Sequence, residues 1–205
     1  MKESWRLYAL PILKEKNYRW SKSWTSIDDI GRLYDGREFT YNDYLKTEQA
    51  YVNLLISLFR YLHAQKIKII QLEVYEDLLP NTIYDKDGKL NEWYNKVKNN
   101  MSLSLDNLQY IVPLILRENM WGTIYHKRTR TYIHFGYDYY VYVNSPMFYF
   151  CNDNNAYFNI DLERLVSSNG LFIEYNTIRI TQKLHGREYN EVLLHDLSDR
   201  CAGHA

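Results

Sequence analysis

Residues 131–144 (TYIHFGYDYYVYVN) alternate between two kinds of side chain, which predicts a β-strand with one face on a core. The odd positions are aliphatic and aromatic, whereas the even positions combine tyrosine rings with imidazole, carboxylate and amide groups. The first set is Ile133, Phe135, Tyr137, Tyr139, Val141 and Val143, and the second is Tyr132, His134, Gly136, Asp138, Tyr140, Tyr142 and Asn144. An aromatic, hydrogen-bonding face of this kind is typical of recognition surfaces.

The clearest helical pattern covers residues 40–64. Thr40 is the expected N-cap, with Asp43 three residues later as a variant of the capping box. Glu48 falls largely outside the apolar stripe. Ser26, followed by two acids, predicts a short capped turn upstream. The stripe recurs at helical spacing and consists of Tyr44, Tyr51, Leu54, Leu55, Leu58, Phe59 and Leu62.

The other elements follow from the same patterns. The alternation in the strand at 66–74 breaks near Ile70, which indicates a bulge or two-sided burial. Pro113 should kink or split the helix at 104–119. The remaining predictions are helices at 92–99 and 161–168, the second ending before Gly170, and strands at 121–125, 131–143, 171–175 and 177–181.

This order predicts an α+β fold, in which helices pack on one face of a mostly antiparallel sheet. We expect a single domain over residues 1–200. Within it, residues 1–39 form an irregular segment rich in Trp and Tyr, and 201–205 are a disordered or non-native tail. Hydrophobic residues make up 46% of the 205 positions, which is enough for one core.

Charge and hydropathy narrow the function classes. Lys+Arg and Asp+Glu each number 25, so the formal net charge is zero, which argues against general nucleic-acid binding but not against a local basic patch. The N-terminus lacks the apolar core of a signal peptide, and no apolar run is long enough to span a membrane. We expect a cytoplasmic protein with free thiols at Cys151 and Cys201.

No pattern in the chain specifies a reaction. Phosphate-binding glycine loops, nucleophile motifs and metal-ligand spacings of His or Cys are absent from the sequence, so no cofactor and no metal are expected. His134 and Asp138 share a strand face, but a regular strand separates them by about 13 Å, far beyond hydrogen-bond reach. The sequence therefore favours a non-enzymatic binding protein.

Charged segments next to the predicted strands are further candidates. Lys127, Arg128 and Arg130, beside Tyr125 and Tyr132, combine cations with aromatic rings as single-stranded nucleic-acid sites do. A solvated hairpin loop is the simpler interpretation of a neutral chain. The acidic group that follows the strand at 66–74 is a secondary candidate for partner binding and consists of Glu73, Glu76 and Asp77.

Several segments, in order from about residue 23 to 174, resemble a family of small bacterial proteins similar to immunity proteins of polymorphic toxin systems. They include SWTSIDDIG at 23–31, LRENMW at 116–121, HFGYDYYVY at 134–142 and GLFIE at 170–174. Shorter matches lie at 34–36, 40–45, Glu48 and 50–52. The sequence departs from the family pattern after Glu174. The resemblance implies a protein that binds and neutralises a cognate toxin domain.

We therefore expect an immunity protein whose partner-binding residues are Tyr132, His134, Asp138, Tyr140 and Tyr142. Three other interpretations stay open. The first is a metal-dependent hydrolase or nuclease using His134 and Asp138 with Glu118 or Glu73. The second is an RNA-binding module built on the loop at 126–130. In the third, the tyrosine face is covered by the chain's own N-terminus, which carries Trp5, Trp20 and Trp24.

Overall fold

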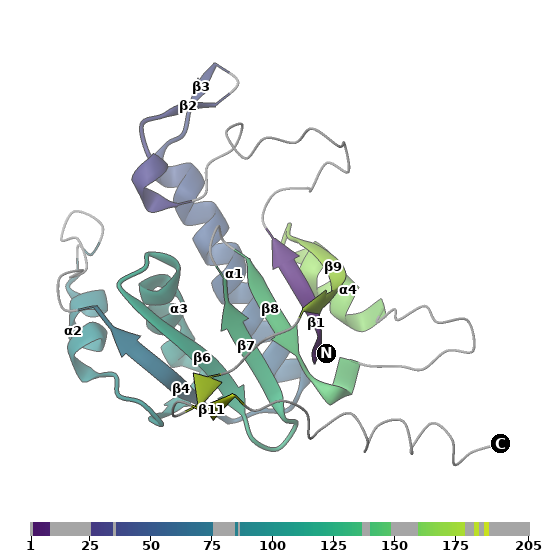
Figure 1. Cartoon of the computed structure of the whole chain (residues 1–205). Coiled ribbons are helices and arrows are strands. Elements are labelled where there is room, and N and C mark those ends of the chain that lie inside the picture. Colours follow the sequence, from purple (N-terminus) through teal and green to yellow (C-terminus); the bar gives the residue numbers. More distant parts are fainter. Residues whose placement is uncertain are drawn as a thin grey trace, which may run out of the picture.

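The computed structural model describes residues 2–8, 26–34, 36–75, 85, 87–136, 140–148, 160–178, 183–184 and 187–188 (Figure 1). At 2–8, 160, 174–178, 183–184 and 187–188 only the backbone is described. Among the predicted site residues, Glu76, Asp77 and Asp138 lie outside these ranges. So do Trp20, Trp24, both cysteines and the C-terminal tail.

One antiparallel sheet of seven strands forms the centre of the fold, in the order β5-β4-β6-β7-β8-β1-β9. Its strands are β1 (Lys2–Tyr8), β4 (Lys66–Val74), β5 (Ser102–Ser104), β6 (Met120–His126), β7 (Thr131–Phe135), β8 (Val141–Asn144) and β9 (Phe172–Ile178). Two short hairpins do not pair with this sheet. They are β2 (Leu33–Tyr34) with β3 (Arg37–Glu38), and β10 (Lys183–Leu184) with β11 (Arg187–Glu188).

Helices α1 (Tyr41–Tyr61) and α3 (Leu108–Leu116) lie side by side behind the sheet, and α4 (Ile160–Ser168) joins them next to β9 (Figure 1). Helix α2 (Lys89–Lys96) packs on α3. Three short 3₁₀ turns complete the described elements, η2 (Ile27–Asp29), η3 (Leu105–Asn107) and η4 (Pro146–Phe148). The predicted α+β class, with helices against an antiparallel sheet, is confirmed. Among the described residues, no helix has both the length and the apolar character needed to cross a bilayer.

The predicted capping box starts α1. The Thr40 hydroxyl accepts a hydrogen bond from the Asp43 backbone N–H at 3.2 Å, and the Asp43 carboxylate accepts one from the Thr40 N–H at 3.2 Å. Each side chain thus satisfies a backbone donor that the first helical turn leaves unpaired. Ser26 caps η2 in the same way, with Asp29 as its reciprocal partner.

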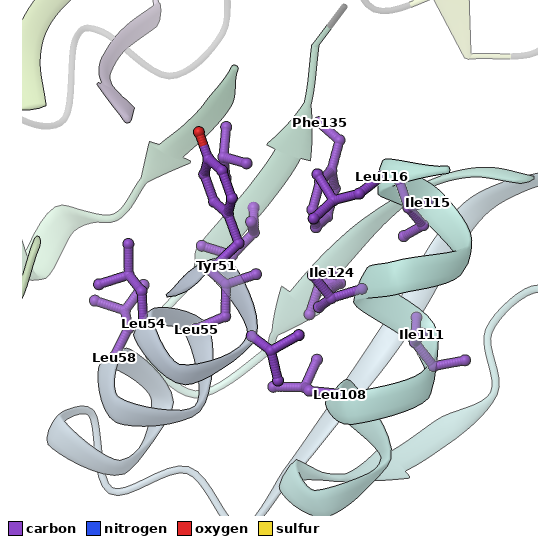
Figure 2. Close-up of a cluster of buried hydrophobic side chains, with 14 of the residues drawn as sticks. Tyr51, Leu54, Leu55, Leu58, Leu108, Ile111, Ile115, Leu116, Ile124 and Phe135 are labelled. Carbon is purple, nitrogen blue, oxygen red and sulfur yellow. The ribbon is translucent and has the colours of Figure 1, made fainter. Parts of the chain in front are cut away.

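The core lies between α1, α3 and the sheet (Figure 2). Leucines 54, 55 and 58 of α1 and the apolar side of α3 meet the inward residues of the central strands. Ile124, Ile133, Phe135, Val141 and Val143 supply those strand positions and are all buried. Burying this apolar stripe against the sheet stabilises α1 more than helix propensity does.

The long strand predicted over residues 131–143 is wrong, because the chain turns back after Phe135 and returns as β8. The Gly136 N–H donates to the Tyr140 carbonyl at 2.7 Å inside this turn. Phe135 pairs with Val141, and His134 with Tyr142. Odd positions therefore pair with odd and even with even, and directly opposed residues share a face. The predicted division into two faces is confirmed for residues 132–135 and 141–144, whereas residues 137–139 lie outside the described ranges.

The N-terminal segment predicted to be irregular contains a strand. Residues 2–8 form β1 between β8 and β9, with Trp5 opposite Val143 and Tyr175. The alternation in KESWRLY is too weak to predict this strand, which forms because neighbours on both sides satisfy its backbone groups. The two strands predicted at 171–175 and 177–181 are likewise replaced by one strand, β9.

Glu48 is buried, although the helical pattern places it off the apolar stripe. Its carboxylate accepts two hydrogen bonds from Arg117, at the end of α3, and a third from the Tyr44 hydroxyl. The charge is therefore paired at the junction of the two helices. The helix predicted over 104–119 is also shorter, with Pro113 inside α3 and a 3₁₀ turn, η3, before it.

Candidate binding face of the sheet

The sheet face opposite α1 and α3 carries a group of half-buried rings around one buried threonine, which we call the aromatic face. It comprises Trp121, Thr123 and Tyr125 of β6, Tyr132 and His134 of β7, and Tyr142 of β8. These positions alternate with the buried residues of the core, so strand geometry turns them away from the helices.

Strand register arranges this face in two rows. One row runs from Lys68 through Tyr125 and Tyr132 to Asn144. The second row runs from Ile70 through Thr123 and His134 to Tyr142. Neighbours within a row lie on adjacent strands, about 4.8 Å apart, so their side chains are within reach of one another.

Tyr125 and Tyr132 form the first aromatic pair. Their ring centroids are 4.5 Å apart, with 27° between the ring planes. Burial, together with the hydrogen bond to the Tyr125 hydroxyl, raises the pKa of Tyr132 above its ordinary value. The pair is ordered before any ligand arrives, so binding to it would cost little side-chain entropy.

His134 belongs to a hydrogen-bond network with Thr123 and Gln71. Its Nδ1 lies 3.2 Å from the Thr123 hydroxyl, and that hydroxyl donates to the Gln71 side-chain carbonyl at 3.3 Å. A hydroxyl has one proton to donate, so when Thr123 donates to Gln71 its oxygen accepts from His134, and Nδ1 carries the proton. In the neutral ring, Nε2 is then the hydrogen-bond acceptor.

Gln71 reaches this network because β4 is irregular. The pairing of β4 with β6 shifts between Ile70 and Glu73, and Gln71 has a φ of 54°. The sequence predicts a bulge as one of two explanations for the broken alternation, and the bulge is confirmed. It turns the Gln71 side chain toward Thr123, which is a role that the sequence does not reveal.

Rings flank His134 on both sides. Its centroid lies 5.6 Å from that of Trp121 and 6.4 Å from that of Tyr142. The Tyr142 ring lies over Gly136, where an added Cβ would come within 2.7 Å of the Tyr142 Cε2 atom. The absence of a side chain at Gly136 therefore leaves room for the Tyr142 ring in this position.

Three of the predicted site residues, Tyr132, His134 and Tyr142, come together on this face. Tyr140 is half-buried just before β8 and offers its carbonyl to the turn. Glu73 is exposed opposite Trp121 in the register. The predicted partner-binding set lacks Trp121, Thr123, Tyr125 and Gln71, of which the sequence suggested only Tyr125, as a neighbour of the basic loop. The first three share one parity in MWGTIYH, a signal that could have placed them on the same face.

The structure also places the residues of the alternative metal and RNA sites. Among the described residues, no three His, Cys, Asp or Glu side chains gather as metal ligands would. His126, at the border of the basic loop, is buried on the core side, where its Nδ1 lies 2.8 Å from the Thr129 hydroxyl. A chain of hydroxyls continues from Thr129 through Thr131 to Ser145.

No known protein family, curated protein or solved structure matches this chain. The resemblance to immunity proteins therefore stays a prediction, and the binding face rests on its own geometry.

The lowered pKa values of His126 and His134 predict a loss of stability in mild acid. Burial lowers the pKa of His134, and burial with the nearby Arg128 charge lowers that of His126. The unfolded chain, with histidine pKa values of about 6.5, therefore takes up protons that the folded chain does not. The stability present above about pH 6.5 is lost as the pH falls toward the folded pKa values.

Urea unfolding at about pH 7.5 and 5.5 measures this effect, on either side of the unfolded pKa. We expect a lower free energy of unfolding at the acidic pH and a smaller difference in the His134→Gln protein. An equal difference in parent and variant would mean that His134 is not held neutral by the fold.

Proposed function

We propose that this chain is a binding protein that docks a cognate protein partner on the aromatic face, as an immunity protein of bacterial competition docks its toxin. The observation that carries the proposal is the ordered set of rings around His134. Aromatic side chains on a rigid scaffold are the usual energetic centres of protein interfaces.

The polar groups of the face support a specific contact. The neutral His134 offers Nε2 as an acceptor, so the matching partner group is a hydrogen-bond donor. Trp121 and Tyr142 flank this acceptor and would exclude water once a partner docks, which strengthens the hydrogen bond. The resemblance of the sequence to immunity proteins names the class of partner, a toxin domain.

The proposal is tested by identifying the partner and then measuring its affinity for variants. The tagged chain is incubated with lysate of the source cells, and proteins that elute in stoichiometric amount are identified by mass spectrometry. Calorimetry then compares the parent with Tyr132→Ala and Tyr142→Ala. Each variant should lose about 2 kcal/mol of binding free energy, as expected for a central aromatic contact.

Two further variants separate binding from folding. Gly136→Ala keeps every ring but forces the Tyr142 ring to move, so it should also weaken the complex. Tyr61→Ala removes an exposed tyrosine at the end of α1, away from the face, and should leave affinity unchanged. A partner that binds the three face variants as tightly as the parent would place the interface elsewhere.

A further inference from the structure

A group of cations lies at one end of the sheet, although the whole chain is neutral. Strand β4 begins with Lys66 and Lys68, and the β6–β7 turn carries Lys127, Arg128 and Arg130; all five are exposed. Lys68 pairs with Tyr125 close to that turn, so the start of β4 and the turn share one end of the sheet (Figure 1).

The stacked tyrosine pair borders these cations. Lys68, Tyr125 and Tyr132 occupy neighbouring strands of one row, which places the Lys68 and Tyr132 Cα atoms about 10 Å apart. From the turn, the positive charge of Arg130 acts on the Tyr132 hydroxyl and opposes the rise of its pKa. Cations from two separate parts of the sequence thus flank one pair of rings.

We infer that this end of the aromatic face binds single-stranded nucleic acid, with backbone phosphates against Lys68 and Arg130 and a base stacked on the Tyr125–Tyr132 pair. Sites for single strands combine a track of cations with aromatic rings on which bases stack. Sheets with rings on the face opposite their helices serve this purpose in RNA-binding modules.

Charge and stacking together favour this ligand over an acidic protein surface. The carboxylates of an acidic surface would pair with the cations alone, whereas a nucleotide pairs with the cations through its phosphate and also stacks its base on the rings. The zero net charge of the chain argues against binding over the whole molecule, and it does not bear on a local cluster. The inference stands apart from the protein partner proposed above, because it names another ligand and needs no partner for its test.

Two polyanions of similar charge distinguish binding of nucleic acid from binding of an acidic protein surface. Fluorescence anisotropy is measured with a labelled oligouridylate of about 12 nucleotides, within the usual range of site sizes, and with an oligoglutamate of similar length. We expect the RNA to bind at least about tenfold more tightly than the peptide, as one stacked base provides. Repeating the titration at about 50 and 200 mM salt gives the number of phosphate contacts.

Variants distinguish the contribution of base stacking from that of the phosphate contacts. Tyr132→Ala should weaken RNA binding about tenfold without changing the salt dependence, and Tyr132→Phe should bind like the parent, because it keeps the ring. Arg130→Ala should weaken binding and lower the slope of log affinity against log salt by about 0.7, the value for one phosphate contact. Lys46→Ala removes an exposed cation near the N-terminus of α1. It should change neither the affinity for RNA nor its salt dependence.

Either of two results would overturn the inference. One is the absence of RNA binding at the lower salt concentration. The other is equal binding of both polyanions with no effect of Tyr132→Ala, which would assign the cations to an acidic protein surface. The search for a protein partner is decided by the pull-down and calorimetry, so the two proposals can fail separately.

Discussion

The Arg117→Ala protein should have a free energy of unfolding about 3–5 kcal/mol below that of the parent, because the substitution leaves a buried carboxylate without its cation. Arg117 Nε and Nη2 each donate to the Glu48 carboxylate at 2.7 Å. The side chains are only 8% and 6% exposed. Burial opposes the charge of Arg117, but the hydrogen bonds and attraction of Glu48 raise its pKa above the ordinary value.

Urea unfolding near neutral pH measures this loss, and a triple variant provides its control. Glu48→Met with Arg117→Met replaces the ion pair by apolar side chains, and Tyr44→Phe removes the hydroxyl that donates to Glu48. Replacing a buried ion pair in this way is often neutral or stabilising. We therefore expect the triple variant to be more stable than Arg117→Ala. A loss below about 1 kcal/mol for Arg117→Ala would indicate a pair that is solvated like a surface salt bridge.

The Phe59→Ala protein should be destabilised by about 3–5 kcal/mol, the usual cost of removing a fully buried ring. Phe59 has no exposed surface, and its ring lies 6.3 Å from that of His126, nearly perpendicular to it. Removing the ring leaves a cavity between α1 and β6 that the neighbouring helix and sheet cannot close.

A second measurement links this loss to His126. Burial lowers the pKa of His126 more than the charge of Arg128 does, so water admitted by the cavity should raise that pKa toward its ordinary value. An NMR titration of the imidazole measures the change. Phe59→Leu keeps most of the apolar volume and should cost less than Phe59→Ala in both measurements. A large loss of stability with an unchanged His126 pKa would mean that other residues exclude water from the imidazole.

Two of the segments on which the predicted resemblance to immunity proteins rests meet in the folded chain. Glu48 belongs to the helix segment and Arg117 to the LRENMW segment, and these residues form the buried ion pair. The sequence shows both residues but not their pairing, because 69 positions separate them. Helical spacing alone places Glu48 on the polar side, since a periodic pattern registers hydrophobicity and not the presence of a partner.

The binding face likewise combines features that the sequence predicts with features that only the fold produces. Alternation in residues 131–144 predicts which side chains leave the core, and Tyr132, His134 and Tyr142 do so. The pattern cannot show the turn after Phe135, because an antiparallel return with odd positions opposite odd positions keeps the alternation unbroken. The rings of Trp121 and Tyr125 join the face only through the pairing of β6 with β7.

By itself, the sequence determines the features whose hydrogen bonds and contacts form between residues a few positions apart. The capping boxes at Thr40 and Ser26 and the inward and outward sides of each strand are of this kind. Only the tertiary structure decides which strands become neighbours and which charges share a site. Lys68 meets Tyr125 across 57 residues because strand pairing depends on burial of the whole sheet, a constraint that no local window of sequence contains.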